Sequence, residues 1–121
     1  MPADDRIHLV RLNEFRRIVR QAICQSPYYV HGMNGTKVET QFLCDEESGR
    51  YLLLNIGWQG KTRVFSPILY ICLKQDKIWI EEDWTENGIT EDLLRAGVRH
   101  DEIVLGFQHP NMRPLTDFAV A

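Results

Sequence analysis

Residues 77–107 read KIWIEEDWTENGITEDLLRAGVRHDEIVLGF, and this stretch decides the fold of the chain. It opens as a strand, because Ile78 and Ile80 are two residues apart and point to the same side of a pleated chain. A charged turn over residues 82–88 comes next, and its Gly88 permits the positive φ that other residues avoid.

A short helix is predicted after the turn. Thr90 is placed to cap it by accepting backbone N–H bonds, and Gly97 is placed to end it with a left-handed residue. Leu93 contributes to its apolar face. Residues 103–107 form a second apolar run, either a buried strand or the end of a helix. The stretch therefore indicates much about the fold and little about chemistry.

The length and composition are those of one folded domain. A chain of 121 residues is long enough for a core, and we assign residues 1–121 to a single domain. A hydrophobic content of 44% with 26% charged residues is typical of globular proteins and not of disordered ones. The net charge of −3 argues against non-specific nucleic-acid binding by the whole surface, because neutralising phosphates requires clustered Lys and Arg.

The cysteines and the N-terminus indicate the compartment. Cys24, Cys44 and Cys72 are odd in number, widely spaced and in no CxxC arrangement. This pattern disfavours a disulfide framework or a zinc ribbon and predicts reduced, mostly buried thiols. The N-terminus lacks the apolar region of a signal peptide, and no apolar run is long enough to span a bilayer. We therefore expect a cytoplasmic protein without membrane contact.

Apolar residues at three- and four-residue spacing predict an amphipathic helix over about residues 8–25. Ser26-Pro27 ends it, because proline disfavours a helical conformation in the preceding residue. The polar face carries a candidate DNA contact made of Arg16, Arg17 and Arg20. We favour a solvated helix face over DNA binding, because Glu14 dilutes the basic patch.

The apolar period then changes to two, which predicts strands over residues 38–44, 51–58, 62–73 and 77–81. Pro67 predicts a bulge or an edge position in the third of them. Short turns join the strands, so we expect an antiparallel meander. The predicted fold class is α+β: an N-terminal helix packed on a meander of about four strands, followed by a short helix and a C-terminal strand or short-helix segment.

The strand at residues 51–58 is apolar on both faces. Such a strand lies centrally in a sheet that is covered on both sides, or it lies at an oligomer contact. We therefore expect a homo-oligomer, a dimer or larger. The candidate contact residues are Leu53, Trp58, Trp79 and Trp84.

The segments outside these elements are predicted to be irregular. Residues 27–36 contain turn signals, and their side chains Tyr28, Tyr29 and His31 either form a binding lip or pack over the core. Residues 109–113 are predicted to form a turn or one helical turn. The apolar side chains near the end of the sequence, Leu115, Phe118 and Val120, predict that this end packs against the domain.

The densest carboxylate group consists of Glu81, Glu82, Asp83 and Glu86. Metal-dependent nucleases use such acids to hold Mg²⁺, but no Glu-x-Lys follows on this strand. We favour solvated acids at the end of a strand and the start of a helix. Residues 100–102 match no metal-ligand spacing, and the sequence contains no nucleophile elbow, Walker loop or dinucleotide glycine pattern. We assign no catalytic residue, metal ligand or cofactor.

Several motifs taken together resemble one known family. They are DEESGRYLLLNIGW at residues 45–58, Gly60-Lys61, Arg63-Val64, KIWIEEDWTENGI at residues 77–89, IVLGF at residues 103–107, Pro110, Arg113 and the terminal TDFAVA. Their layout resembles the XisI-like family, named for the fdxN element excision controlling factor of heterocyst-forming cyanobacteria. The similarity runs from the first helix to the last residue, and the combination is specific although each motif alone is weak.

The resemblance implies a small α+β protein that accompanies a XisH-type partner, itself similar to restriction-type endonucleases, in the excision of a DNA element. The family has no agreed catalytic residues, so none is carried over to this chain. The family's repeated motif positions fall here on Gly57, Trp58, Trp79, Asp83, Thr85, Glu86, Gly88, Arg113 and Thr116.

The charged turn is the candidate site on which the residues and the resemblance agree. The turn residues are Glu82, Asp83, Thr85, Glu86 and Gly88. Short acceptors such as Asp83 can satisfy backbone N–H groups there, and Arg113 is placed to pair with Asp83 or Glu86. These residues form either a structural turn or a partner-binding site, and we favour the structural interpretation because surface ion pairs are weak indicators of function.

The leading functional hypothesis is a non-enzymatic accessory factor that controls a XisH-like partner by protein–protein contact and reaches DNA only through that partner. The acidic residues 81–92 suit a basic nuclease surface. One alternative is direct DNA binding through the arginines of the first helix. A third hypothesis is a metal-dependent phosphodiesterase at the carboxylate turn.

Overall fold

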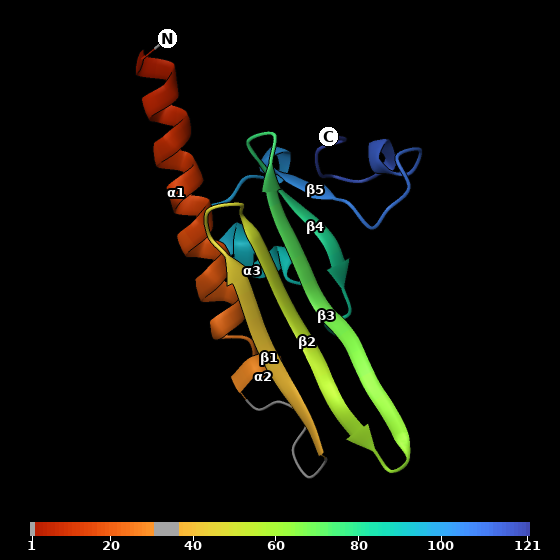
Figure 1. Cartoon of the computed structure of the whole chain (residues 1–121). Helices are drawn as coiled ribbons and strands as arrows, with labels where there is room; N and C mark the ends of the chain where they lie inside the picture. The colour runs from red at the N-terminus through yellow and green to blue at the C-terminus, as the bar shows by residue number, and fades with distance from the viewer. Residues whose placement is uncertain (1, 31–36) are drawn as a thin grey trace.

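A computed structural model describes residues 2–30 and 37–121, with side chains described for residues 9–29 and 37–121. The described chain begins with α1 (Pro2–Cys24) and α2 (Pro27–Val30). The long strands that follow are β1 (Lys37–Asp45), β2 (Arg50–Gln59), β3 (Thr62–Lys74) and β4 (Lys77–Asp83). The remaining elements are α3 (Thr90–Arg95), η1 (His100–Glu102), β5 (Ile103–Leu105) and η2 (Arg113–Leu115) (Figure 1).

The strands form one sheet in the order β1-β2-β3-β4-β5. The first four are antiparallel neighbours joined by short turns, and β5 pairs in parallel with β4. A parallel pair requires a crossover connection, and α3 lies in the connection between β4 and β5. The predicted α+β fold with its antiparallel meander is therefore confirmed, and the second apolar run of residues 77–107 is a strand.

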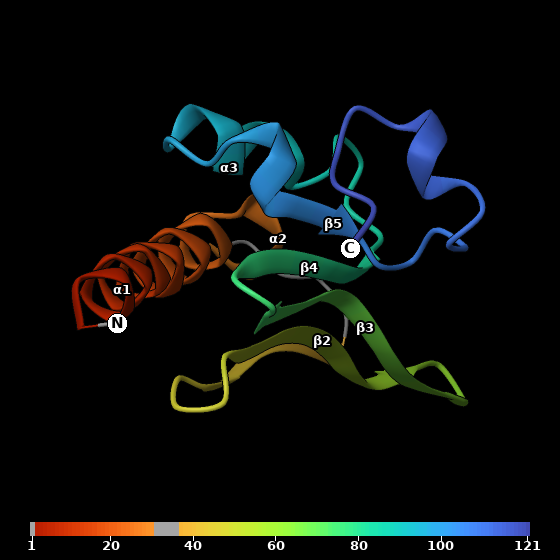
Figure 2. The same cartoon turned by 90° about the horizontal axis from the view of Figure 1, so that it is seen from above.

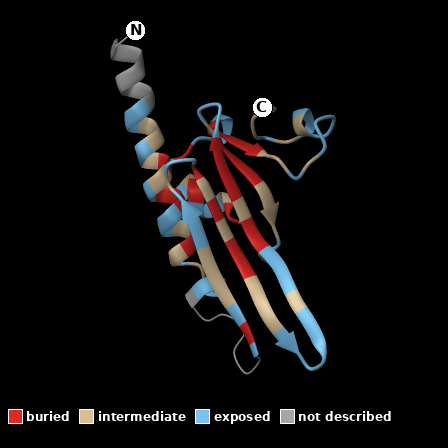
Figure 3. Cartoon of the chain, viewed as in Figure 1, coloured by how far each residue is buried: buried red, intermediate tan, exposed pale blue. Residues whose placement is uncertain are grey.

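The main core lies between α1 and one face of the sheet (Figures 2 and 3). The helix contributes its apolar stripe, in which Phe15, Val19 and Ile23 are at most 1% exposed. The sheet contributes alternate side chains, and Tyr51 and Leu53 of β2 are both fully buried there. Because successive side chains of a strand point to opposite faces, the residues that alternate with Tyr51 and Leu53 point to the other face of the sheet.

The C-terminal segment, residues 106–121, covers part of the other face of the sheet. Ala119 donates its N–H to the carbonyl of Ile103 at 2.8 Å, and a small second cluster forms around Trp79 and Val104. Figure 2 shows this segment on the side of the sheet opposite α1 and α3. Of the three side chains predicted to pack there, Phe118 is partly buried against the core, whereas Leu115 and Val120 remain 77% and 55% exposed.

The β2–β3 hairpin continues beyond the rest of the sheet. β4 pairs with β3 only over Leu69–Lys74, so residues 62–67 of β3 have β2 as their strand neighbour and no β4 beside them. We call residues 55–67 the arm. The register shifts where Leu53 pairs with Leu69 and the next residue pairs with Pro67, which confirms the predicted bulge at the proline. Figure 3 shows the exposed end of the arm.

The backbone of the arm approaches β1 most closely at Gly57, where a side chain has no room. Its φ is +152°, and a Cβ atom there would lie 2.2 Å from the carbonyl oxygen of Lys37. Any other residue would force the β1 and β2 backbones apart, which is the physical reason for glycine in the Gly57-Trp58 pair.

Several predicted boundaries were wrong. α1 begins at Pro2 and not near residue 8, because proline suits the first turn of a helix. Residues 27–30, predicted as loop, form α2, and residues 31–36 with the His31 of the proposed lip lie outside the described residues. β4 runs on to Asp83, because a bulge at Glu81 lets the strand include the first acids of the predicted turn.

The predicted cap and the predicted thiols also need correction. Thr90 does not cap α3: Ile89 occupies the cap position and no side-chain cap bond is made. Cys24, Cys44 and Cys72 are free as predicted, but Cys44 is exposed. No helix within the described residues is both long enough and apolar enough to cross a membrane.

Candidate functional site

Asp83 organises the charged turn that follows β4. Its Oδ1 accepts hydrogen bonds from the Thr85 N–H at 3.0 Å and from the Thr85 hydroxyl at 2.5 Å. Its Oδ2 accepts the N–H of Ile89 at 2.8 Å, which supplies the acceptor that Thr90 does not. One carboxylate therefore ties the end of β4 to the start of α3.

Two further residues fix the shape of this turn. Glu86 donates its backbone N–H to the hydroxyl oxygen of Tyr28 at 2.7 Å, which links the turn to α2. Gly88 has a φ of +76°, a conformation that costs other residues about 1 kcal/mol or more. The turn is thus held from both sides, and its exposed acids have defined positions.

Arg113 lies away from this turn, contrary to the pairing that the sequence suggested. Its Nε donates to the carbonyl of Gln108 at 3.1 Å and its Nη2 to that of Gly106 at 3.3 Å. The guanidinium carbon lies 5.2 Å from the ring centroid of Trp79. Arg113 therefore fastens the C-terminal segment over Trp79 and forms no ion pair with Asp83 or Glu86.

A notch of about 420 Å³ opens between the turn and the junction of α1 with α2. Tyr28 and Pro27 form its wall on the helix side, and Glu86, Asn87 and Asp92 lie on the opposite side. Leu69 lines it from the sheet. A concave site with an apolar wall and acids at its edge suits a long cationic side chain, whose stem packs and whose charge pairs.

The edge of the notch is strongly acidic. Glu86, Glu91 and Asp92 are exposed, and Arg95 lies 3.4 Å from Asp92 and 3.8 Å from Glu91. Within the part of the chain that the structure describes, no three His, Cys, Asp or Glu side chains are arranged to hold a metal ion.

The arginines of α1 do not form a free cationic stripe. Arg20 is ion-paired with Glu46, and Arg16 donates to the side-chain oxygen of Asn13 at 2.8 Å. Arg17 is exposed. Two of the three side chains proposed for DNA contact thus already have partners within the chain, which disfavours that alternative.

The residues proposed for an oligomer contact divide into two pairs. Leu53 is fully buried under α1 and Trp79 is 8% exposed beneath Arg113, so neither is available as a contact. α1 covers Leu53, and the C-terminal segment covers Trp79. The period of two predicts that each residue lies in a strand but not which segment covers it. Trp58 and Trp84 are 50% and 73% exposed.

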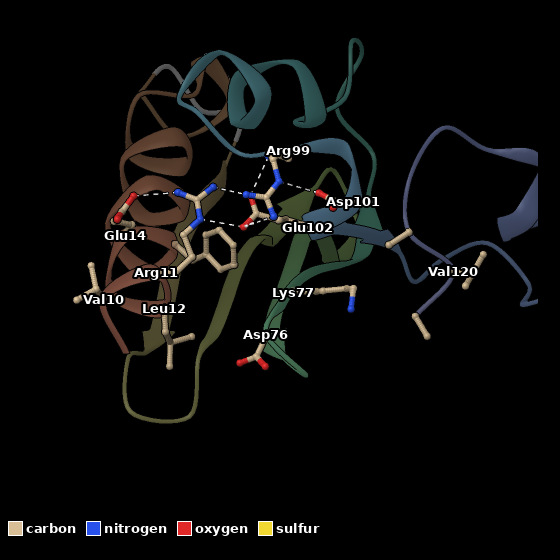
Figure 4. A pocket seen from close by; sticks show the side chains of 13 residues that line it. Val10, Arg11, Leu12, Glu14, Asp76, Lys77, Arg99, Asp101, Glu102 and Val120 are labelled. Atoms are coloured by element: carbon tan, nitrogen blue, oxygen red, sulfur yellow. Dashed lines mark hydrogen bonds and ion pairs between the residues drawn. The ribbon is translucent and has the colours of Figure 1, made fainter. Parts of the chain in front are cut away.

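A second, larger cleft lies between α1, the β3–β4 turn and the C-terminal segment (Figure 4). Its volume is about 940 Å³, and its apolar wall includes Leu12, Phe15 and Val120. Figure 4 shows Arg11, Arg99 and Glu102 together at one end of the cleft, away from Val120. These three were not singled out as a group from the sequence.

Glu102 is the buried charge of this cleft, at 7% exposure. Its Oε2 accepts the Arg11 Nε–H at 2.9 Å, and its Oε1 accepts the Arg11 Nη2–H at 2.5 Å and the backbone N–H of Arg99 at 2.9 Å. A sequence signal existed: Arg11 stands four residues before the buried Phe15, so it lies on the apolar stripe of α1.

The electrostatics of the cleft follow from this geometry. Hydrogen bonds from Arg11, helped by the Arg99 N–H, hold the pKa of Glu102 below its usual value despite burial. The same bonds raise the pKa of Arg11 above its usual value. Elsewhere in the core, burial raises the pKa of Tyr51 to about 12. The Arg11–Glu102 pair stays ionised at neutral pH and joins α1 to η1.

The family model described as XisI protein matches residues 9–120. The chain belongs to the XisI protein family. The match covers α1 from residue 9 onward, the strands β1–β5 and the charged turn, so it includes the notch and all but one residue of the larger cleft. It also confirms the resemblance predicted from the sequence motifs.

Two solved structures with XisI names are similar to this chain over nearly their whole length. The crystal structure of fdxN element excision controlling factor XisI from Anabaena variabilis is 39% identical, with a TM-score of 0.80 over 92% of this chain and 99% of that one. A XisI-like protein from the same species is 32% identical, with a TM-score of 0.83 over 91% and 99%. No protein with a curated functional description matches the chain.

Proposed function

We propose that this XisI-family chain is an accessory factor of DNA element excision that controls a DNA-acting partner by direct contact. The observation that carries the proposal is the relative named as an excision controlling factor, 39% identical over 92% of this chain. The notch and its acids supply a candidate means of contact. The partner proposed is a XisH-like protein of the restriction-endonuclease type.

Charge supports a partner with a basic surface. The acids at the edge of the notch are exposed, and Asp83 holds the backbone that presents them. A nuclease surface that contacts DNA is basic, so an acidic docking surface speeds its encounter and rejects acidic competitors. Glu86 and Asp92 are the residues proposed to make this contact, and Tyr28 positions Glu86.

The test compares two matched double variants in binding to a XisH-like protein by calorimetry. Glu86→Lys with Asp92→Lys reverses the acids of the notch and leaves Asp83 in place. Asp101→Lys with Asp117→Lys reverses two exposed acids elsewhere. We expect affinity to fall about tenfold or more in the first variant only, with a weaker salt dependence.

The outcomes separate the function from the site. Failure of the wild-type chain to bind any XisH-like protein overturns the proposed function. Binding that both double variants weaken equally, or that neither weakens, keeps the partner but removes the notch as its contact. Melting temperatures of all variants establish that each remains folded.

A further inference from the structure

Apolar side chains remain in contact with water on the face of β1–β3 that points away from α1. We call this surface the open face and define it by Leu43, Leu52, Ile56, Trp58, Phe65 and Tyr70. Phe65 is 70% exposed, Leu43 52% and Trp58 50%. Single exposed apolar residues are ordinary, but a contiguous group on one sheet face is not.

Cross-strand pairing makes the open face continuous. Leu43, Leu52 and Tyr70 are register partners across the three strands. Ile56 and Phe65 are partners further along the arm. Residues that pair directly across antiparallel strands point to the same side of the sheet, so the group lies along β2 on both sides of Leu54, which points the same way but is only 4% exposed.

The same side of the sheet is already covered over β4 and β5. There the C-terminal segment buries Trp79 and Val104, with Arg113 and Ala119 above them. Within the described residues, this cover extends no further than Tyr70. Of the outward row of β2, Leu54 is buried at 4% exposure, whereas Trp58 at the end of the arm is 50% exposed.

We propose that the open face binds the open face of a second copy of this chain. The two sheets pack face to face, and the two-fold axis lies in the interface and runs across the strands. Each copy then places Phe65 and Trp58 of its arm over Leu43 and Leu52 of the other. This isologous contact covers the exposed apolar side chains of both copies at once.

The charges at the two ends of the open face support this arrangement. The β1–β2 turn carries the exposed Asp45 and Glu47, and the arm carries the exposed Lys61 and Arg63 at the opposite end of β2. Arg50, the register partner of Asp45, offsets one of these two acids, so Glu47 supplies the excess negative charge at that end. An axis running across the strands sets this end of one copy over the basic end of the other. An axis along the strands would instead bring like charges together, which disfavours it.

Single-stranded nucleic acid is the competing occupant, because aromatic side chains next to basic ones also stack bases. The open face is a poorer fit for it. Leu43, Leu52 and Ile56 are aliphatic, and the register places Glu39 beside Ile56 and Glu82 beside Tyr70. Aliphatic side chains with carboxylates between them bury well against a protein and repel phosphates.

The experiment is sedimentation velocity of the full chain over a range of concentrations. The wild type should be a dimer, and Phe65→Asp should raise the dimer dissociation constant by about tenfold or more. Leu115→Asp, at an exposed position outside the open face, should leave it unchanged. A wild type that stays monomeric up to about 100 µM, or equal effects of the two variants, overturns the proposal.

A charge exchange tests the orientation and the competing occupant. Lys61→Glu and Glu47→Lys should each weaken the dimer, and the two together should restore it; a double variant as weak as the singles overturns the two-fold arrangement. A labelled single-stranded oligonucleotide serves as the second probe. Binding to monomeric wild type that Phe65→Asp abolishes would assign the face to nucleic acid and overturn the dimer.

Discussion

Asp83 is the residue on which the acidic turn depends. Its two oxygens accept three hydrogen bonds, which span from Thr85 to Ile89. Because both ends of the turn are held by one carboxylate, the position of Glu86 at the notch depends on it. At the scale of single residues, Asp83 is a positioning group and Glu86 is the group proposed to meet a partner.

We predict that Asp83→Asn destabilises the chain by about 1–2 kcal/mol, because an amide has one accepting oxygen where the carboxylate has two. At least one donor of the turn then loses its acceptor. Urea denaturation measures the change in the free energy of unfolding. Asp117→Asn is the matched control at an exposed position and should change it by less than about 0.5 kcal/mol. Equal changes in the two variants would contradict the role given to Asp83.

Glu102 yields a prediction about pH. Its pKa is lower in the folded chain than its ordinary value of 4.5, chiefly because Arg11 bonds to it. The stability that this group contributes is therefore complete above the unfolded pKa and is lost as the pH falls through the folded pKa. The free energy of unfolding of the wild type should decline as the pH falls below about 4.5.

Glu102→Gln removes the titrating group and should flatten this decline. At neutral pH the variant should be less stable by about 1.5–3 kcal/mol, because the part-buried Arg11 loses its charge-assisted bonds to Glu102 and keeps only Glu14 and the carbonyl of Gly97. Urea denaturation of both chains across the acidic range checks both statements. Parallel pH curves for wild type and variant would show that the Arg11–Glu102 pair does not control acid stability.

At the scale of elements, β4, α3 and β5 form the unit that completes the sheet. Leu93 of α3 is fully buried, next to Val98 and Ile103 of the following connection and strand. We predict that Leu93→Ala lowers the free energy of unfolding by about 2–5 kcal/mol, because it leaves a cavity in the core. Leu115→Ala, at a 77% exposed position, should have almost no effect on the denaturation midpoint. A similar loss in both would contradict the packing of α3.

The elements that the sequence predicts well are those with a strong local pattern. The period of two over β1–β4 and the apolar stripe of α1 locate these elements, because each period follows from local backbone geometry. The periods did not separate core from contact residues: Leu53, predicted as an oligomer contact, is a fully buried core side chain. The bulge at Pro67 was predictable for the same reason.

Long-range partners were not predictable from local pattern. Arg113 binds the carbonyls beside Trp79 and not the acidic turn, and Arg11 pairs with Glu102 across 91 residues. Local spacing does not indicate which distant segment covers a sheet face, so Trp79 was predicted as an oligomer contact, whereas the C-terminal segment covers it. The charged turn was recognisable in the sequence because Asp83, Thr85 and Gly88 carry local turn chemistry.

At the scale of the whole molecule, the two proposed contacts lie on opposite sides of the sheet. The notch is formed by α1, α2 and the charged turn, whereas the open face points away from α1. A dimer through the open face therefore leaves both notches accessible to partners. Such a dimer would bind two basic partners at once. If the two partners act together on one DNA, the dimer binds the pair more tightly than a single copy binds one partner.

The most direct measurement is light scattering coupled to size exclusion, with this chain alone and mixed with a XisH-like protein from the same genome. We predict a stable complex that contains both proteins, and for the chain alone a mass of two copies of the 14.2 kDa chain. Two separate peaks with unchanged masses would contradict the accessory function. A complex formed by a monomeric chain would keep that function and contradict only the dimer.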